Sequence, residues 1–247
     1  MKKIKFILMA MVAMISAAAF AGETLPEFTD APNAFVVNAK PIKGKHDDFI
    51  QVINFTDEAD IKFSIYGWRK KDGWTKLASD VTSTYGDSKK LETEYDHQFN
   101  RWEVFAFVPE NGKTYKIEYT KFKIEMWVVE HYFGAFRIIP DSVAPGPNAY
   151  IFENASIKGS FKDNLRAGGK NGVTMKILGS NDKENWEVVG GGITNVKEDE
   201  ADDYCSLESV NEKKTASYKF YSVELTDGKK YDFNVFKSHN DLYFVVK

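Results

Sequence analysis

The residues that could do chemistry are few in this chain and widely spaced. Its four histidines are His46, His97, His131 and His239. None of them has a second histidine or a cysteine at the spacing of a metal site. Ser160 lacks the second glycine of a nucleophile elbow, and the glycine runs at 168–169 and 190–192 lack the Lys-Ser/Thr pair of a phosphate loop. We therefore expect a protein that is not an enzyme and has no catalytic residues, no metal ligands and no cofactor.

Acidic residues leave two alternatives open. The run at 198–203 could ligate Ca²⁺, but it lacks the interleaved glycine and the ligand spacing of a known calcium loop. A solvated loop is the simpler interpretation, because runs of like charge repel one another and stay exposed. The paired carboxylates of a glycoside hydrolase are defined by distance in space, so the sequence leaves a hydrolase as the least supported option.

Cys205 is the only cysteine, so no disulfide can form within the chain. Its neighbours Asp202, Asp203 and Glu208 are acidic, which disfavours a reactive thiolate. We expect an inert side chain. A disulfide with another chain is the alternative.

Aromatic side chains are the best candidates for binding, because their rings can stack on the apolar face of a sugar or anchor a protein partner. Trp68 continues the outward-facing positions of Lys62 and Ser64 in an alternating segment. A tryptophan on such a polar face indicates a contact surface. The predicted ligand-binding residues are Trp68, Tyr66, Trp102, Tyr85 and Tyr204.

The elements that must position these residues occur twice. The segment at 32–44 recurs at 147–159 with a shift of 115, and six of its thirteen positions are identical. An alternating apolar segment recurs at a shift of 112, and a hairpin signal, Asn-Gly in one copy and Asp-Gly in the other, recurs at a shift of 116. The shifts differ only by small insertions in loops. A tandem duplication of one β unit is therefore the simplest explanation.

Each copy also contains a glycine, a polar turn and a tryptophan, at 67–74 and at 179–186. Trp74 and Trp186 correspond at the shift of 112, so we expect both to be core residues with a structural role. Trp68 has no such counterpart, because a serine takes its position in the second copy. That difference favours a role in binding for Trp68.

The composition and the alternating segments favour strands. We expect an all-β protein with two tandem antiparallel β-sandwich domains, jelly-roll or Ig-like, that arose by internal duplication. The expected divisions are a signal peptide at 1–21, a first domain at 22–130, a linker at 131–146 and a second domain at 147–247.

The first 21 residues have the features of a signal peptide. Three lysines precede a short apolar stretch that ends in Ala-Phe-Ala at 19–21, and no cysteine follows for a lipid anchor. Cleavage there removes three lysines and no acids, so 33 basic and 36 acidic residues become 30 and 36, a net charge of −6. An acidic chain without a basic cluster argues against nucleic acid. We expect a periplasmic or secreted protein that is not a lipoprotein and does not insert in the membrane after cleavage.

Residues 177–189 carry the pattern Gly-Ser-x-Asp-x-x-x-Trp, from Gly179 to Trp186. This segment resembles the corresponding part of discoidin-type (F5/8 type C) domains, and residues 218–224 are similar to the strand that follows in that family. The resemblance implies a galactose-binding-like jelly roll whose loops bind sugars or lipid head groups. The first copy has Trp-Arg-Lys at 68–70 in place of Ser-Asn-Asp, and the flanking cysteines of the family are absent, so no binding residue is carried over.

Together these observations predict a non-catalytic exported binding protein that recognises a glycan or a surface polymer. The alternative is a structural or protein-interaction component of the bacterial cell envelope. The expected partner is accordingly a glycan or an envelope protein.

Overall fold

The computed structural model describes residues 24–38, 49–92, 101–126, 129–194 and 204–247. These residues form sixteen β-strands and no α-helix, so the prediction of an all-β protein is confirmed. No helix among the described residues is long and apolar enough to cross a membrane. The expected signal peptide and the acidic run lie outside the described residues.

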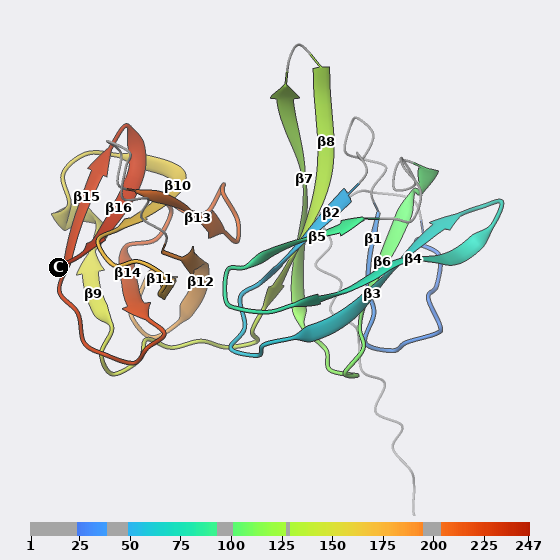
Figure 1. Ribbon diagram of the computed structural model, residues 1–247, viewed down its shortest axis with the longest axis horizontal. Helices are drawn as coiled ribbons and strands as arrows, with labels where there is room; N and C mark the ends of the chain where they lie inside the picture. The colour runs from blue at the N-terminus through green and yellow to red at the C-terminus, as the bar shows by residue number, and fades with distance from the viewer. Residues whose placement is uncertain (1–23, 39–48, 93–100, 127–128, 195–203) are drawn as a thin grey trace, which may run out of the picture.

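The strands form two consecutive groups of eight, which we call the N-terminal unit (residues 24–139) and the C-terminal unit (residues 147–247) (Figure 1). The N-terminal unit contains β1 (Phe35–Asn38), β2 (Phe49–Asn54), β3 (Ile61–Arg69), β4 (Gly73–Thr82), β5 (Ser88–Glu92), β6 (Val104–Pro109), β7 (Lys116–Met126) and β8 (Val129–Ile139). The C-terminal unit contains β9 (Tyr150–Glu153), β10 (Phe161–Gly168), β11 (Thr174–Ser180), β12 (Trp186–Ile193), β13 (Cys205–Ser209), β14 (Phe220–Leu225), β15 (Phe233–Ser238) and β16 (Asn240–Val246).

The N-terminal unit contains two four-stranded sheets, ordered β1-β6-β3-β4 and β5-β2-β8-β7. One hydrophobic core lies between them, and its fully buried residues come from both sheets. They include Ile50, Val52, Phe63, Ile65, Phe105, Phe107, Phe136 and Ile138. Because β3 and β6 alternate inward and outward side chains, each strand gives this core every second residue.

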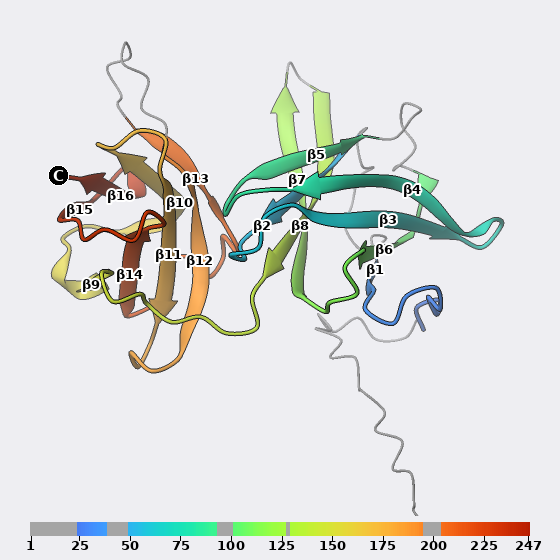
Figure 2. The same cartoon turned by 60° about the horizontal axis from the view of Figure 1, so that its bottom comes forward.

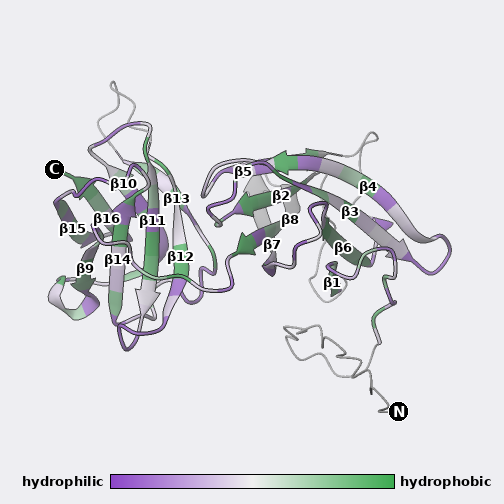
Figure 3. Ribbon diagram, turned by 90° about the horizontal axis from the view of Figure 1, so that it is seen from below, coloured by the Kyte–Doolittle hydropathy of each residue, from purple (hydrophilic) through white to green (hydrophobic). Residues whose placement is uncertain are grey.

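The C-terminal unit has a single eight-stranded sheet, ordered β15-β16-β10-β13-β12-β11-β14-β9. Figure 2 shows that this sheet curls strongly around its own core. The core is again rich in aromatic residues, with Tyr221 and Phe244 fully buried and the rings of Phe152 and Tyr221 stacked at 5.6 Å. In both units the hydrophobic residues concentrate in the strands and the hydrophilic ones in the loops (Figure 3).

The two units have the same strand order. Numbered from β9, the C-terminal sheet runs β9-β14-β11-β12 and then β13-β10-β16-β15, which repeats the two N-terminal sheets strand for strand. Most pairs are antiparallel, but β2 pairs parallel to β8, and β10 pairs parallel to β16. The expectation of purely antiparallel sheets is therefore wrong at these two places. Period-two alternation does not distinguish a parallel neighbour from an antiparallel one.

Three glycines account for the one difference in strand pairing. In the C-terminal unit Gly190 and Gly191 of β12 pair with β13, whereas β4 and β5 belong to separate sheets. Gly191 has φ +153° and Gly192 has φ +152°, a region that is open almost only to glycine. A Cβ on Gly190 or Gly191 would overlap the main chain of a neighbouring strand. At the shift of 112 the N-terminal unit has Ala, Ser and Asp at these positions, which cannot approach so closely.

A glycine–aromatic contact also occurs in both units. A Cβ on Gly67 would lie 2.5 Å from the ring of Trp102, and a Cβ on Gly179 would lie 2.5 Å from the ring of Tyr218. Trp102 and Tyr218 correspond at the shift of 116. Trp102 is only 9% exposed and belongs to the core, so little of its ring is accessible to the ligand that the sequence predicts for it. Its ring fills the space that the absent side chain of Gly67 leaves.

The Asn-Gly and Asp-Gly turns do not form the predicted hairpins, because β6 and β7 lie in different sheets and β14 does not pair with β15. Their glycines have positive φ, +74° at Gly112 and +71° at Gly228. In the second turn Asp227 accepts hydrogen bonds from the hydroxyl of Tyr231 at 2.7 Å and from the backbone N–H of Lys229 at 3.1 Å. Lys170 forms an ion pair with the same carboxylate. The hydrogen bond from Tyr231, with help from Lys229 and Lys170, lowers the pKa of Asp227 to about 2.

This lowered pKa predicts a pH-dependent contribution to stability. The ionised Asp227 stabilises the fold above the ordinary aspartate pKa of about 3.9, and this contribution is lost as the pH falls toward the folded pKa of about 2. We expect the difference in melting temperature between wild type and Asp227→Asn to be constant above about pH 5 and to shrink between about pH 4 and pH 2. Thermal melts across this range measure it.

Asn111 provides the matched control, because it holds the same turn position in the N-terminal unit and bonds the hydroxyl of Tyr115 at 2.8 Å without a charge. The difference between wild type and Asn111→Ala should not follow the titration of an aspartate. A wild-type to Asp227→Asn difference that stays unchanged down to pH 2 would contradict the prediction.

The connection between the units is shorter than the expected linker at 131–146. Residues 131–139 belong to β8, so the joint is limited to residues 140–146. A third hydrophobic cluster lies between the units. Its buried residues are Ile53, Phe55, Tyr85 and Ile139 from the N-terminal unit, and Leu178, Val188 and Val210 from the C-terminal unit. An ion pair between Asp57 and Lys176 also joins the units.

Candidate functional site

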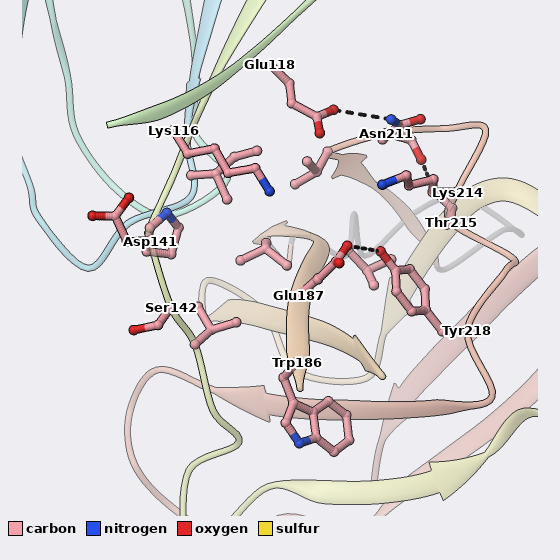
Figure 4. Close-up of a pocket in the computed structure, with 16 residues that line it drawn as sticks. Lys116, Glu118, Asp141, Ser142, Trp186, Glu187, Asn211, Lys214, Thr215 and Tyr218 are labelled. Atoms are coloured by element: carbon pink, nitrogen blue, oxygen red, sulfur yellow. Dashed lines mark hydrogen bonds between the residues drawn. The ribbon is translucent and has the colours of Figure 1, made fainter. Parts of the chain in front are cut away.

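A narrow cleft with a free volume of about 60 Å³ lies between the two units, beside the third hydrophobic cluster. Four segments of the chain form its walls: the start of β7, the joint, the start of β12 and the loop that follows β13 (Figure 4). Its polar lining residues are Lys116, Glu118, Asp141, Ser142, Glu187, Asn211, Lys214, Thr215 and Tyr218. Clefts between domains are preferred places for ligand sites, so this is the candidate functional site.

A rigid turn positions Trp186 at one side of the cleft. Asp182 accepts hydrogen bonds from the backbone N–H groups of Glu184 and Asn185, both at 2.8 Å, and from the Asn185 side chain. These bonds, led by the one from the Asn185 side chain, hold the pKa of Asp182 well below its usual range. The indole N–H of Trp186 donates back to the carbonyl oxygen of Lys183 at 2.9 Å. The Asx-type turn therefore fixes the orientation of the indole.

Neutral donors orient two carboxylates of the cleft. The hydroxyl of Tyr218 donates to Glu187 at 2.7 Å, and the side-chain amide of Asn211 lies 3.3 Å from an oxygen of Glu118. Burial and the nearby Glu187 raise the pKa of Tyr218, so its phenol stays protonated and keeps donating. The Asn211 contact joins the loop after β13 to β7 of the other unit. Both acids keep further acceptor capacity, because a carboxylate has about four lone-pair sites.

Two lysines supply donors from opposite sides. In Figure 4 the side chains of Lys116 and Lys214 extend toward the space between the units, one from each unit. The lining thus combines cationic donors, anionic acceptors and neutral hydroxyl and amide groups, with the indole of Trp186 at its edge. Such a mixture matches a ligand with many hydroxyl groups, because each hydroxyl both donates and accepts.

No protein-family model, no curated protein and no solved structure matches this chain. The site must therefore be interpreted from its own geometry. Among the described residues, no group of three or more His, Cys, Asp or Glu side chains could hold a metal ion.

None of the five predicted ligand-binding residues lines this cleft. Tyr85 is only 7% exposed and lies in the cluster between the units, with its ring 5.5 Å from that of Phe55. Its hydroxyl is 3.5 Å from the carbonyl oxygen of Gly190. The C-terminal unit covers most of Tyr85, which lines a different pocket, beside Thr56, Lys176 and Glu224. Here the segment that contains Tyr85 packs against the glycines at 190–192.

Tyr66 and Trp68 lie together on the outer face of β3, opposite the face that packs on Trp102. Both are half-buried. Phe28 packs against Tyr66 at 5.0 Å and against Trp74 at 4.9 Å, so the segment before β1 covers part of this face. The indole of Trp74 donates to the carbonyl oxygen of Glu27 at 2.8 Å.

The correspondence of Trp74 and Trp186 was interpreted as a sign of two core residues. Both are half-buried instead, one under the N-terminal segment and the other beside the cleft. Sequence reasoning therefore missed Trp186 as a functional candidate, together with Lys116, Lys214 and Tyr218. One signal could have found part of the site, since the divergent middle segment at 190–216 includes the loop that lines the cleft.

Proposed function

We propose that this protein is a non-catalytic binding protein that recognises a glycan in the cleft between its two units. The observation that carries the proposal is the combination of a fixed indole, Trp186, with donors and acceptors from both units. Sugars bind where an aromatic ring meets their apolar C–H face and polar side chains meet their hydroxyls. The bound glycan would contact both units at once.

We further propose that the units are two tandem β-sandwich domains derived by duplication. Support comes from the identical strand order, from the glycine–aromatic contacts at Gly67 and Gly179, and from the recurring sequence segments. With the end of β8 taken into account, the divisions become 22–139 and 147–247. A discoidin-like ancestry of the C-terminal domain belongs to the same proposal, on the turn that holds Trp186.

Export to the periplasm or the medium is part of the proposal as well, based on the signal-peptide features of residues 1–21. The expression host should release a mature protein that begins at Gly22. Mass spectrometry of the intact protein tests this, and a mass that retains the first 21 residues would contradict it.

Trp186→Ala is expected to weaken glycan binding by about 30-fold, because truncating an aromatic contact residue can remove about 2 kcal/mol. A glycan array identifies the oligosaccharide, and calorimetry with that oligosaccharide measures the affinity. Trp186→Phe keeps an aromatic ring and should retain most of it.

Trp74→Ala is the matched control, since Trp74 occupies the same position in the N-terminal domain, away from the cleft. It should bind as wild type does. Urea denaturation of each variant separates loss of binding from loss of folding. Equal affinity of wild type and a folded Trp186→Ala would refute glycan binding in this cleft.

A second candidate function is protein interaction in the cell envelope, and one observation favours it. The short strand β9 ends the eight-stranded sheet, and it exposes Tyr150 at 37% and Ile151 at 47%. An unpaired edge with exposed apolar residues can add a strand from a partner. A purified protein that stays monomeric at high concentration and captures no envelope protein would count against this function.

A further inference from the structure

The outer face of the C-terminal sheet carries three aromatic rings, which we call the outer aromatic cluster: Tyr204, Phe236 and Tyr243. Phe236 of β15 and Tyr243 of β16 are register partners, and their rings stack with centroids 4.7 Å apart and planes 2° apart. Tyr204, which precedes β13, lies nearly perpendicular to Tyr243 at 4.9 Å. Their strand neighbours Val235 and Phe244 pack into the core. The cluster therefore faces away from the core, because alternate side chains of a strand point to opposite faces.

A polar network lies beside these rings. Arg166 of β10 is the register partner of Tyr243 on one side and of Ser206 on the other. Its guanidinium donates to Asp241 at 2.9 Å and to the hydroxyl of Ser206 at 3.0 Å. Asn164 donates to the second oxygen of Asp241 at 2.9 Å. The side chain of Asp241 is only 8% exposed, whereas that of Arg166 is 34% exposed, so a buried acid holds a half-exposed base in place.

Tyr204 is the most accessible ring of the cluster, at 37% exposed. At the shift of 116, the N-terminal unit has Thr120 where the C-terminal unit has Phe236. The ring stack is therefore specific to the C-terminal unit. A structural role common to both units therefore does not explain the ring stack.

We propose that the outer aromatic cluster is a second binding site, which takes one ring of an uncharged sugar chain. The apolar face of the sugar packs on Tyr204, and its hydroxyls bond to Arg166 and Ser206. This inference rests on the proposed class of ligand but not on the cleft, since none of these residues lines the cleft.

Two observations favour a sugar over a protein partner. The residues beside the rings are polar and already fixed by hydrogen bonds, whereas the centre of a protein interface is mainly apolar and low in charge. The ion pair with Asp241 also offsets the charge of Arg166, so the site has no net attraction for an acidic ligand. Fixed donors beside an exposed ring match the needs of a neutral polyol.

Affinity electrophoresis of the mature protein tests the proposal. The gels contain xylan, a soluble β-glucan or no polysaccharide, and pull-downs with insoluble cellulose and chitin complete the panel. We expect the wild type to be retarded or captured by at least one of these polymers. Tyr204→Ala should weaken that binding about tenfold, which corresponds to about 1.4 kcal/mol. Tyr204→Phe should keep most of it, because stacking needs the ring and not the hydroxyl.

Tyr150→Ala is the matched control, since Tyr150 is equally exposed on the edge strand β9. It should behave as wild type does. Thermal melts check that Tyr204→Ala is folded, and Tyr204→Phe keeps the test open if the alanine variant is not. Arg166→Met should also weaken binding while the rings stay in place.

The outcomes distinguish this site from the cleft. Loss of binding in Tyr204→Ala but not in Trp186→Ala supports the outer aromatic cluster and contradicts the cleft, and the reverse result overturns the inference alone. Losses in both single variants support two sites. The inference also fails if no polymer of the panel binds, or if Tyr204→Ala abolishes capture of an envelope protein but changes no polysaccharide binding.

Discussion

Replacing Tyr85 by alanine is expected to destabilise the protein by about 3–5 kcal/mol, the range for truncating a buried aromatic residue. The ring is buried between the units, where it contacts Phe55 and Gly191, and the ammonium of Lys176 lies 5.1 Å from its centre. Removing it opens a cavity in the cluster that joins the two units. Urea denaturation measures the loss. We also expect one cooperative transition to separate into two, because the units then hold each other less firmly.

Tyr85→Phe is the control, because it retains the ring and removes only a hydroxyl whose contact with Gly190 is long. We expect a loss below about 1 kcal/mol. If Tyr85→Ala lost no more stability than Tyr85→Phe, the ring would not hold the units together.

Gly191→Ala is expected to destabilise the C-terminal unit by about 3 kcal/mol or more. The backbone at Gly191 has φ +153°, where a side chain costs about 1–3 kcal/mol. In addition, the new Cβ would overlap the carbonyl oxygen of Met175 on β11 and would lie 2.7 Å from the ring of Tyr85. Neither group is the free end of a flexible side chain, so strands must move apart. The urea midpoint, with circular dichroism as the signal, measures the effect.

Gly192→Ala separates the cost of the strained backbone from the cost of steric overlap with neighbouring strands. Gly192 has φ +152°, yet the nearest atom to its Cβ would be 3.6 Å away. It should show the backbone strain alone, about 1–3 kcal/mol. Ser79→Ala, at the position of Gly191 in the N-terminal unit, is exposed and should stay within about 0.5 kcal/mol of wild type. If Gly191→Ala and Gly192→Ala lost equal stability, the close approach of strands at Gly191 would not contribute to the cost of the substitution.

Much of the fold could be predicted from the sequence, because local signals and the internal repeat agree. The alternating segments form strands as predicted. The Asn-Gly and Asp-Gly turns have glycines with positive φ, but they connect strands that do not pair, so the hairpin prediction is wrong. Parallel pairing of β2 with β8 was missed, since it depends on segments more than 70 residues apart rather than on local pattern. The end of β8 was misplaced because its apolar residues resemble those of a packed joint.

The candidate site was harder to predict for a physical reason. Alternation places Trp68 on an outer face, but it does not show that Phe28 and the rest of the N-terminal segment lie over part of that face. Tyr85 is in a polar segment, yet the other unit buries it. The cleft joins four segments from both units, so no single stretch contains its pattern. Only Tyr204, among the five predicted residues, lies in a cluster that is open to solvent.

The contact between the units joins two different surfaces. The N-terminal unit contributes Tyr85 and Gly86, and the C-terminal unit receives them on its glycines at 190–192. Such a head-to-tail contact does not close on itself, so identical units could add to it without limit and form a fibre. At the equivalent positions the N-terminal unit has Ala78, Ser79 and Asp80, whose side chains leave no room for the same close contact.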